Sequence, residues 1–260
     1  MSQERSGGYD FASLRDIVAR LRSPEGCPWD KRQTHTSLQP FLVEECYEVL
    51  HAIEKGDYQK LCEELGDLLL QIMLHAQIAS ESGQFDIDDV VAGIAGKLVR
   101  RHPHVFGGEM VTGAKEVELN WEVLKREERG AEESLLSGVP ETMPALAYSQ
   151  SVQRRAAAVG FDWEDADDIL DKLVEEVAEI KRASSPEERA REFGDLLFTL
   201  ANIARRLDID LETALRSANQ RFCQRFRYME QVCRERGVEL SSLSLDEQNS
   251  LWEEAKAKLK

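Results

Sequence analysis

The sequence predicts an all-α protein built from two tandem helical modules. Apolar residues recur at the three- and four-residue spacing of amphipathic helices along most of the 260 residues, and there are only seven prolines. Two acidic patterns, Glu-Glu-x-x-Glu and then Glu-x-x-Asp, occur in the same order in each half of the chain. Such a repeat indicates a duplicated unit, and we expect an acidic metal site between two helices of each unit.

The composition limits the class of partner. A net charge of -16 argues against a nucleic-acid polymer as a ligand, because binding to a phosphate backbone needs a basic surface. Five cysteines, without a Cys-x-x-Cys pair, indicate reduced thiols and a cytoplasmic location. No apolar run is long enough to span a membrane, and the polar N-terminus lacks the core of an export signal, so we expect neither insertion nor export.

The first module is expected over residues 1–130. A helix from Phe11 to about Arg22 leads into a loop over residues 23–30, which contains two prolines and a glycine. Thr36 or Ser37 then caps a helix that ends near residue 55, and Gly56-Asp57 turns the chain into a helix over about 58–82. These two helices carry the first pair of acidic patterns.

Two further helices complete the first module. Asp86 to Asp89 supply N-terminal caps for a helix that delivers Lys97 and Arg101 before the turn residues 102–104. A helix over residues 117–129 then carries Trp121 and Lys125. The segment 131–144, which contains two prolines and a glycine, is the predicted linker.

The second module, residues 145–260, repeats this plan in shorter form. A helix over about 145–158 leads into an aromatic entry loop that ends at Trp163. Two acidic helices follow, joined at Ser184-Ser185-Pro186, and a helix from about Ile209 carries a basic pair. The C-terminal helix bears a tryptophan four residues before a lysine, as the helix over 117–129 does.

The acidic patterns are the candidate metal ligands. Carboxylates three or four residues apart are neighbours on a helix, and like charges beside an apolar core raise one another's pKa unless a cation compensates them. Carboxylate oxygens suit Mg²⁺, or Mn²⁺ in its place. One such pattern is more often a solvated helix face, but its ordered repetition favours a site. The residues are Glu44, Glu45, Glu48, Glu64 and Asp67 in one half and Glu175, Glu176, Glu179, Glu192 and Asp195 in the other.

The basic and aromatic residues follow in a matching order. A basic pair four residues apart, and then a tryptophan and lysine four residues apart, occur after each acidic set. Such cations can complement a helix C-terminus, or they can neutralise a phosphorylated ligand held by metal. The residues are Lys97, Arg101, Trp121 and Lys125, and then Arg221, Arg225, Trp252 and Lys256.

A di-iron centre is a weaker alternative. Glu48 and His51 have the Glu-x-x-His spacing of a di-iron half-site in a helical bundle. No second Glu-x-x-His occurs, and Glu64-x-x-Asp67 stands in the place where it would be. The ligand set therefore favours a hard divalent ion over iron.

Taken together, these motifs resemble a MazG-type nucleoside triphosphate pyrophosphohydrolase with two tandem MazG modules. The resemblance extends from about Leu14 to Lys256, and its most specific marks besides the acidic pairs are the runs 27–30, 100–106 and 159–163. It implies an all-α fold, Mg²⁺ bound by the acidic motifs, a homodimer, and hydrolysis of NTPs or dNTPs to the monophosphate and pyrophosphate.

The resemblance also implies a role for each candidate residue. Glu44 or Glu175 would bind a second ion or deprotonate the attacking water. The basic residues would neutralise the triphosphate, and Trp163 and Trp252 are candidates for the wall beside the base or ribose. The metal ligands would be Glu45, Glu48, Glu64 and Asp67, and then Glu176, Glu179, Glu192 and Asp195.

Three questions stay open at the sequence level. The substrate could be narrower, as in dUTP or phosphoribosyl-ATP pyrophosphohydrolases, or the chain could be a regulatory module that binds a nucleotide such as an alarmone without cleaving it. Both acidic sets are complete, so both halves could be active. The shorter connection between its acidic helices favours the second half as the more competent one.

Overall fold

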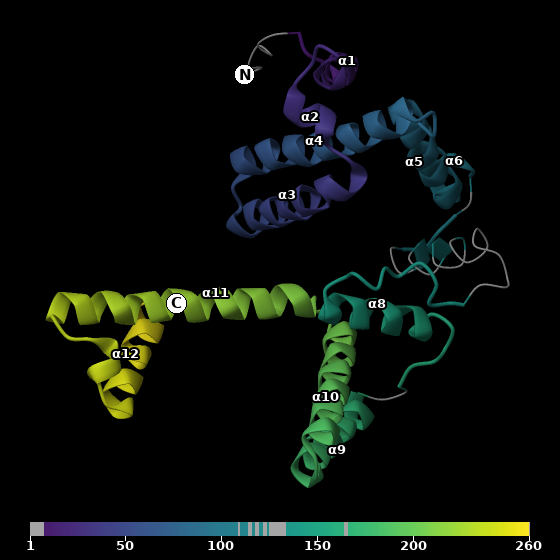
Figure 1. The fold of residues 1–260 in the computed structure, drawn as a ribbon. Coiled ribbons are helices and arrows are strands. Elements are labelled where there is room, and N and C mark those ends of the chain that lie inside the picture. Colours follow the sequence, from purple (N-terminus) through teal and green to yellow (C-terminus); the bar gives the residue numbers. More distant parts are fainter. Residues whose placement is uncertain are drawn as a thin grey trace. The chain divides into compact units, whose positions relative to one another are not determined.

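The computed structural model describes residues 8–108, 110–113, 116–117, 120–121, 124, 134–163 and 166–259, and the side chains of residues 166–168 are excepted. The regular secondary structure of these residues is helical throughout, as predicted (Figure 1). The chain divides into two compact units, Met1–Thr112 and Gly113–Lys260. The linker over residues 131–144 stays a prediction.

The N-terminal unit is organised around an antiparallel pair of long helices. Gly56 ends the first of them in a left-handed conformation with φ of 65°, which glycine adopts without strain, and Asp57 caps the next. The two acidic patterns are thereby placed on facing helices. The helices of the unit are α1 (Phe11–Arg22), α2 (Pro28–Arg32), α3 (His35–Lys55), α4 (Tyr58–Glu81), α5 (Ile87–Arg101) and α6 (Pro103–Phe106).

The core of this unit lies where α1, α3, α4 and α5 meet. Val18, Leu38, Met73, Leu74 and Ile87 are buried there in one apolar cluster. Burying each such side chain contributes on the order of 2 kcal/mol, so this cluster fixes the C-terminal half of α4. The N-terminal half of α4, which carries the acidic pattern, extends from that anchored part.

The C-terminal unit contains a second antiparallel pair of acidic helices. Ser185 caps the second of them, and Pro186 occupies its first position, where no backbone N–H is needed. A separate apolar cluster of Met229, Val232, Cys233 and Leu251 joins the last two helices. The helices are α8 (Ala145–Ala157), α9 (Ala166–Arg182), α10 (Pro186–Arg206), α11 (Leu211–Arg236) and α12 (Leu245–Lys258), with a 3-10 turn η1 (Leu240–Ser242).

Two buried glutamines hold α8 against its neighbours. Gln150 donates to the carbonyl of Ile209 and accepts from the N–H of Leu211, where α11 begins. Gln153 donates to the carbonyl of Phe198 on α10. Both side chains are buried, and Gln150 in particular pairs with backbone groups at the start of α11, where intrahelical partners are lacking.

Three local predictions were wrong. The region around Trp29 was expected to be a loop, but Pro28 begins the short helix α2. The cap of α3 is Thr34 rather than Thr36 or Ser37, because Thr34 and Ser37 form a reciprocal capping box. Pro103 likewise begins a short helix, α6, where a turn was expected. In each proline case the fixed backbone angle suits the first position of a helix.

Among the described residues, no helix is both long and apolar enough to cross a membrane.

Candidate metal centre and substrate site

The acidic side chains of the N-terminal unit converge between α3 and α4. One carboxylate oxygen each from Glu45, Glu48 and Glu64 lies within 4.8 Å of the other two. Glu64 is buried, with 1% of its surface exposed, whereas Glu48 is exposed. The cluster is thus open on one side, and its deepest ligand is fixed by the packing of α4.

Mutual repulsion and burial perturb these carboxyls. Burial, and then the charges of Asp67 and Glu48, raise the pKa of Glu45 above its ordinary value. The pKa of Glu48 is raised as well, chiefly by its contact with the Glu64 carboxyl. The pKa of Glu64 is lowered, because the ammonium of Lys60 lies 2.5 Å from its Oε1. These directions fit a site in which negative charge is concentrated and a further cation would be favourable.

The C-terminal unit repeats this cluster between α9 and α10. Oxygens of Glu176, Glu179 and Glu192 lie within 4.8 Å of one another, and Glu176 and Glu192 are buried. Lys172 lies 3.0 Å from Glu176, and Arg191 donates to Glu192 at 2.7 Å. The duplicated sequence patterns therefore form two clusters of the same composition.

Both clusters fit a hard divalent cation. Lys60 reaches Oε1 of Glu64, but among the described residues Oε2 of Glu64 and Oε2 of Glu176 accept no hydrogen bond of ordinary geometry. Buried carboxylate oxygens without donors are costly, and coordination to a metal would satisfy them. The donor set consists of carboxylates, which suits Mg²⁺ or Mn²⁺.

The remaining acidic candidates lie around the two clusters. Asp67 is close enough to raise the pKa of Glu45, and Asp195 stands one turn after Glu192 on α10. Glu44 and Glu175, the candidates for activating water, are exposed next to cluster residues in sequence. The roles of these four residues stay predictions.

The basic candidates of the N-terminal unit lie on a different helix from the cluster. Lys97 is exposed and Arg101 is half-buried near the C-terminal end of α5. Trp121 is half-buried within a helical segment. Lys125, like most of the helix predicted over residues 117–129, lies outside the described residues.

The basic and aromatic candidates of the C-terminal unit gather on α11 and α12. The guanidinium of Arg225 lies 5.7 Å from the ring centroid of Trp252, and the ring of Phe222 lies 5.2 Å from it. Arg221 and Lys256 are exposed on the same two helices. The structure thus brings Arg225 and Trp252 together, whereas their roles in binding a substrate stay predictions.

Trp163 is held at one end of the antiparallel pair α9 and α10, here called the acidic hairpin, and the acidic cluster lies towards the opposite end. Arg205, near the C-terminal end of α10, donates to the Asp162 carboxylate at 2.5 Å, and Arg206 donates to the Trp163 carbonyl at 2.5 Å. Arg205 follows Glu192 by 13 residues, or about 20 Å along the helix. Within one chain, Trp163 therefore lies away from the acidic cluster, and its role as a wall for the base stays a prediction.

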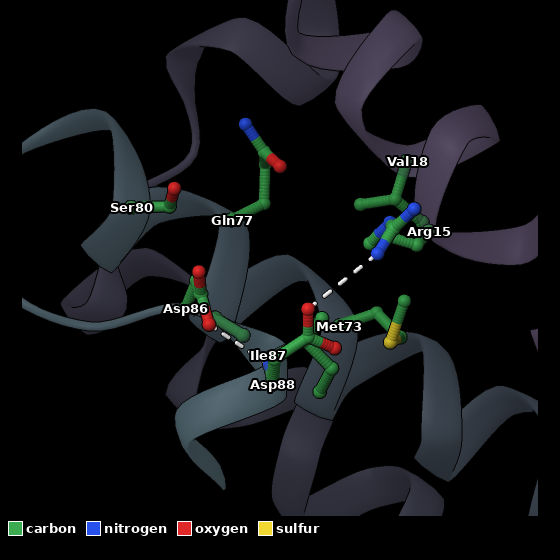
Figure 2. Close-up of a pocket in the computed structure, with 9 residues that line it drawn as sticks. Arg15, Val18, Met73, Gln77, Ser80, Asp86, Ile87 and Asp88 are labelled. Atoms are coloured by element: carbon green, nitrogen blue, oxygen red, sulfur yellow. Dashed lines mark hydrogen bonds and ion pairs between the residues drawn. The ribbon is translucent and has the colours of Figure 1, made fainter. Parts of the chain in front are cut away.

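A cavity of about 240 Å³ in the N-terminal unit lies apart from the acidic cluster. Two of the residues that line it, Arg15 of α1 and Asp88 of α5, form an ion pair with a distance of 3.6 Å between Nη1 and Oδ2 (Figure 2). Its residues on α4 begin at Met73, more than two turns beyond Glu64. No three-carboxylate cluster of the kind found between α3 and α4 lines this cavity.

Comparison with known proteins decides the family. Residues 33–106 match the MazG nucleotide pyrophosphohydrolase domain, and residues 149–222 match the phosphoribosyl-ATP pyrophosphohydrolase family. A Thermotoga maritima protein, named nucleoside triphosphate pyrophosphohydrolase/pyrophosphatase MazG, is 44% identical over 97% of this chain and 98% of its own length. The chain belongs to the MazG family.

Other relatives agree with this assignment. The Escherichia coli (strain K12) nucleoside triphosphate pyrophosphohydrolase is 43% identical over 94% of this chain and 95% of its own length. The Bacillus subtilis (strain 168) protein YabN is 47% identical over 98% of this chain, which corresponds to 53% of YabN. Each of the two domain matches in this MazG protein contains one acidic cluster.

Sequence reasoning missed the cations inside the clusters of this MazG protein. Lys60 and Lys172 each stand four residues before the carboxylate that they contact, Glu64 and Glu176. That i,i+4 spacing was readable in the sequence as an ion pair. The sequence did not show that these ion pairs lie inside the acidic clusters, because that position depends on which face of each helix is buried.

Proposed function

We propose that this protein hydrolyses nucleoside triphosphates to nucleoside monophosphates and pyrophosphate with the help of a divalent metal ion. The observation that carries this proposal is the pair of three-carboxylate clusters, one within each matched domain. Relatives that cover nearly the whole chain are named for this activity. We expect broad base specificity and a role in controlling the nucleotide pool, and Mg²⁺ as the ion.

The chain's own residues would divide the chemistry among them. Glu45, Glu48, Glu64 and Asp67, and their counterparts Glu176, Glu179, Glu192 and Asp195, would hold the metal. When bound, the metal neutralises phosphate oxygens and lowers the pKa of a coordinated water. Glu44 or Glu175 would orient that water and accept its proton, as a carboxylate beside a metal site can do.

The basic and aromatic side chains would bind the nucleotide. Lys97, Arg101 and Lys125, or Arg221, Arg225 and Lys256, would neutralise the triphosphate, and fixed charges of this kind supply most of the stabilisation in phosphoryl chemistry. Trp252 would contact the base or ribose, with Arg225 beside it. Trp121 and Trp163 are the further candidates for that contact.

Two separate helix pairs must meet for the C-terminal site to work. α9 packs against α10, whereas α12 packs against α11, and these two pairs join at α8 and where α10 leads into α11 (Figure 1). The acidic hairpin also exposes apolar side chains such as Val174, Phe193 and Phe198. A homodimer would bury these faces, and α11 and α12 of one copy would complete the acidic site of the other.

Product analysis tests the reaction. The full chain is incubated with Mg²⁺ and a panel of NTPs, dNTPs and phosphoribosyl-ATP, and products are separated by ion-exchange chromatography. Monophosphate together with pyrophosphate is the expected result. Diphosphate together with phosphate would contradict it, and nucleotide binding without turnover would indicate a regulatory module, such as an alarmone binder.

Phosphoribosyl-ATP is the second candidate substrate. Residues 149–222 match the phosphoribosyl-ATP pyrophosphohydrolase family, and this segment contains the complete second acidic cluster. Turnover of phosphoribosyl-ATP well above that of the NTPs in the same panel would favour this narrower activity.

We also propose a cytoplasmic location. All five cysteines are free thiols, which fits a reducing compartment.

A further inference from the structure

Each acidic cluster contains a lysine ammonium. Lys60 stands one helical turn before Glu64 on α4, and its Nζ lies 2.5 Å from Glu64 Oε1. Lys172 stands one turn before Glu176 on α9, and its Nζ lies 3.0 Å from Glu176 Oε1. Glu64 and Glu176 are the most buried carboxylates of their respective clusters.

The two lysines come from different helices of the repeat. Lys60 lies on the second acidic helix of its unit, whereas Lys172 lies on the first acidic helix of the other unit. The two lysines do not occupy equivalent positions of the repeat, so the duplication does not explain why each cluster contains a lysine. The common feature is the contact with the deepest carboxylate, where an uncompensated negative charge would cost most.

A metal ion and the ammonium would compete for the same carboxylate. A divalent cation held by Glu45, Glu48 and Glu64 would need an oxygen of Glu64, and two cations at one carboxylate would repel each other. The Lys60 side chain is 53% exposed and flexible, so it can swing towards solvent. Glu64 is 1% exposed and fixed by packing, so the lysine is the group that can leave.

We propose that Lys60 and Lys172 are tethered cations that neutralise the acidic clusters before metal binds, that the metal displaces them, and that they thereby set the metal affinity of each site. They are positioning residues for the carboxylates, and no catalytic contact is assigned to them. This inference rests on the proposed metal site.

The two clusters differ in the number of competing cations. Glu192 also pairs with Arg191, whose Nη2 lies 2.7 Å from its Oε1, and Glu179 pairs with Arg182 at 3.9 Å. With Lys172, the C-terminal cluster therefore has three cationic neighbours among the described residues. Arg191 would still partly neutralise that cluster after Lys172 was replaced. The effect of removing the lysine should therefore be larger in the N-terminal cluster, which is the better place to test it.

The test is a Mn²⁺ titration of the full-length protein, followed by electron paramagnetic resonance. Glu176→Gln and Glu179→Gln together silence the C-terminal cluster, so the signal reports on the N-terminal one. Adding Lys60→Met should tighten Mn²⁺ binding by about tenfold, which is the scale on which one neighbouring charge shifts a site. The melting temperature without metal should fall, and saturating Mn²⁺ should remove that difference.

Two control variants separate this effect from a general loss of charge. Lys60→Arg keeps the cation and should leave the Mn²⁺ affinity close to that of the parent protein. Lys55→Met removes one positive charge from the C-terminal end of α3 and should leave the Mn²⁺ affinity unchanged. If Lys60→Met lowers the helical content seen by circular dichroism, Lys60→Gln takes its place in the titration.

The outcomes distinguish this inference from the function on which it rests. If the parent protein binds no Mn²⁺, the proposed metal site itself fails. If the parent binds Mn²⁺ and a helical Lys60 variant binds it equally well or more weakly, the metal site stands and the tethered-cation role is overturned.

Discussion

The carboxyl of Glu48 shows how a residue suited to metal binding acts against stability when no metal is bound. Its pKa is raised by contact with Glu64, so its charged form is disfavoured in the folded protein. Stability from this source is gained as the pH falls through the raised pKa, and at neutral pH the charge is a cost. Metal binding would reverse the sign of that cost.

Replacing Glu48 by glutamine should therefore have opposite effects with and without metal. Without metal, Glu48→Gln should keep or raise the melting temperature, because it removes repulsion. In the Glu48→Gln variant, Mg²⁺ should no longer raise the melting temperature through the N-terminal cluster. Differential scanning fluorimetry across a Mg²⁺ series measures both, and an undiminished response to Mg²⁺ would remove Glu48 from the ligand set.

The ion pair between Arg22 and Glu81 should make stability depend on pH. Arg22 is 5% exposed, and its Nε and Nη2 donate to the two Glu81 oxygens at 2.8 Å each. These bonds hold the pKa of Glu81 below its ordinary value of 4.5. Because the folded pKa is depressed, the stabilisation is present above the unfolded pKa and is lost as the pH falls through the folded pKa.

We therefore expect Glu81→Gln to lower the free energy of unfolding by up to ~1 kcal/mol at neutral pH, a value discounted for the exposure of Glu81. The difference from wild type should shrink as the pH falls below 4.5, the ordinary value. Urea denaturation at several pH values measures this difference, with Glu25→Gln, an exposed residue in the loop between α1 and α2, as the control. A loss that is independent of pH would mean that packing, not charge, is responsible.

At the scale of helices, most of the fold was predictable because its signals are local. Gly56 marks the end of α3, Asp57 marks the start of α4, and Asp86 marks the start of α5. The short helices α2 and α6 were missed because a proline reads equally as a break or as a first helical position.

The site was predictable to the extent that it depends on spacing along one helix. The i,i+3 and i,i+4 rules place Glu45 beside Glu48, and the repeat indicates that they face Glu64. Trp163 could not be placed in this way. The ion pair between Asp162 and Arg205 determines its position, and that contact joins residues 43 apart in the chain.

The glycine inside each Glu-x-Gly-Asp pattern makes a prediction about the acidic helices. A helical glycine costs about 1 kcal/mol relative to alanine, yet a Cβ added at Gly66 or Gly194 meets no atom within 4 Å in the described chain. Packing inside one chain therefore does not require either glycine. A close approach by a second copy or by the substrate would explain both.

Accordingly, Gly194→Ala should raise the stability of the isolated subunit but weaken dimerisation or nucleotide binding. Gly93→Ala on α5 is the matched control, because its added Cβ also meets nothing. Analytical ultracentrifugation and nucleotide titration measure the two effects. Unchanged self-association and unchanged nucleotide affinity in Gly194→Ala would show that nothing packs against this position.

At the scale of the whole molecule, the proposed dimer predicts complementation between inactive variants. Both variants carry Glu48→Gln, which inactivates the N-terminal cluster. One variant also carries Glu179→Gln, which disables the acidic part of the C-terminal site. The other also carries Arg225→Ala, which disables the part of that site on α11 and α12. In a mixed dimer, one of the two shared sites would contain neither change. Random assortment would then restore about a quarter of the parent's activity.

Co-expression of the two variants, followed by measurement of pyrophosphate release by the unfractionated mixture, tests this recovery. Light scattering should first show that the protein is a dimer at micromolar concentration. A monomer, or a mixture as inactive as its components, would mean that each chain builds its site alone.

The most direct measurement is Mg²⁺-dependent pyrophosphate release by four proteins: wild type, Glu48→Gln, Glu179→Gln and the double variant. If the acidic clusters are the catalytic metal sites, the double variant should lose activity by at least about a hundredfold, since metal-assisted charge stabilisation supplies at least that much. We expect Glu179→Gln to cause the larger single loss, because the stretch that joins Glu179 to Glu192 is shorter than its counterpart in the N-terminal half, which favours the C-terminal half as the more competent site. A double variant that releases pyrophosphate at the wild-type rate would contradict the assignment of catalysis to either cluster.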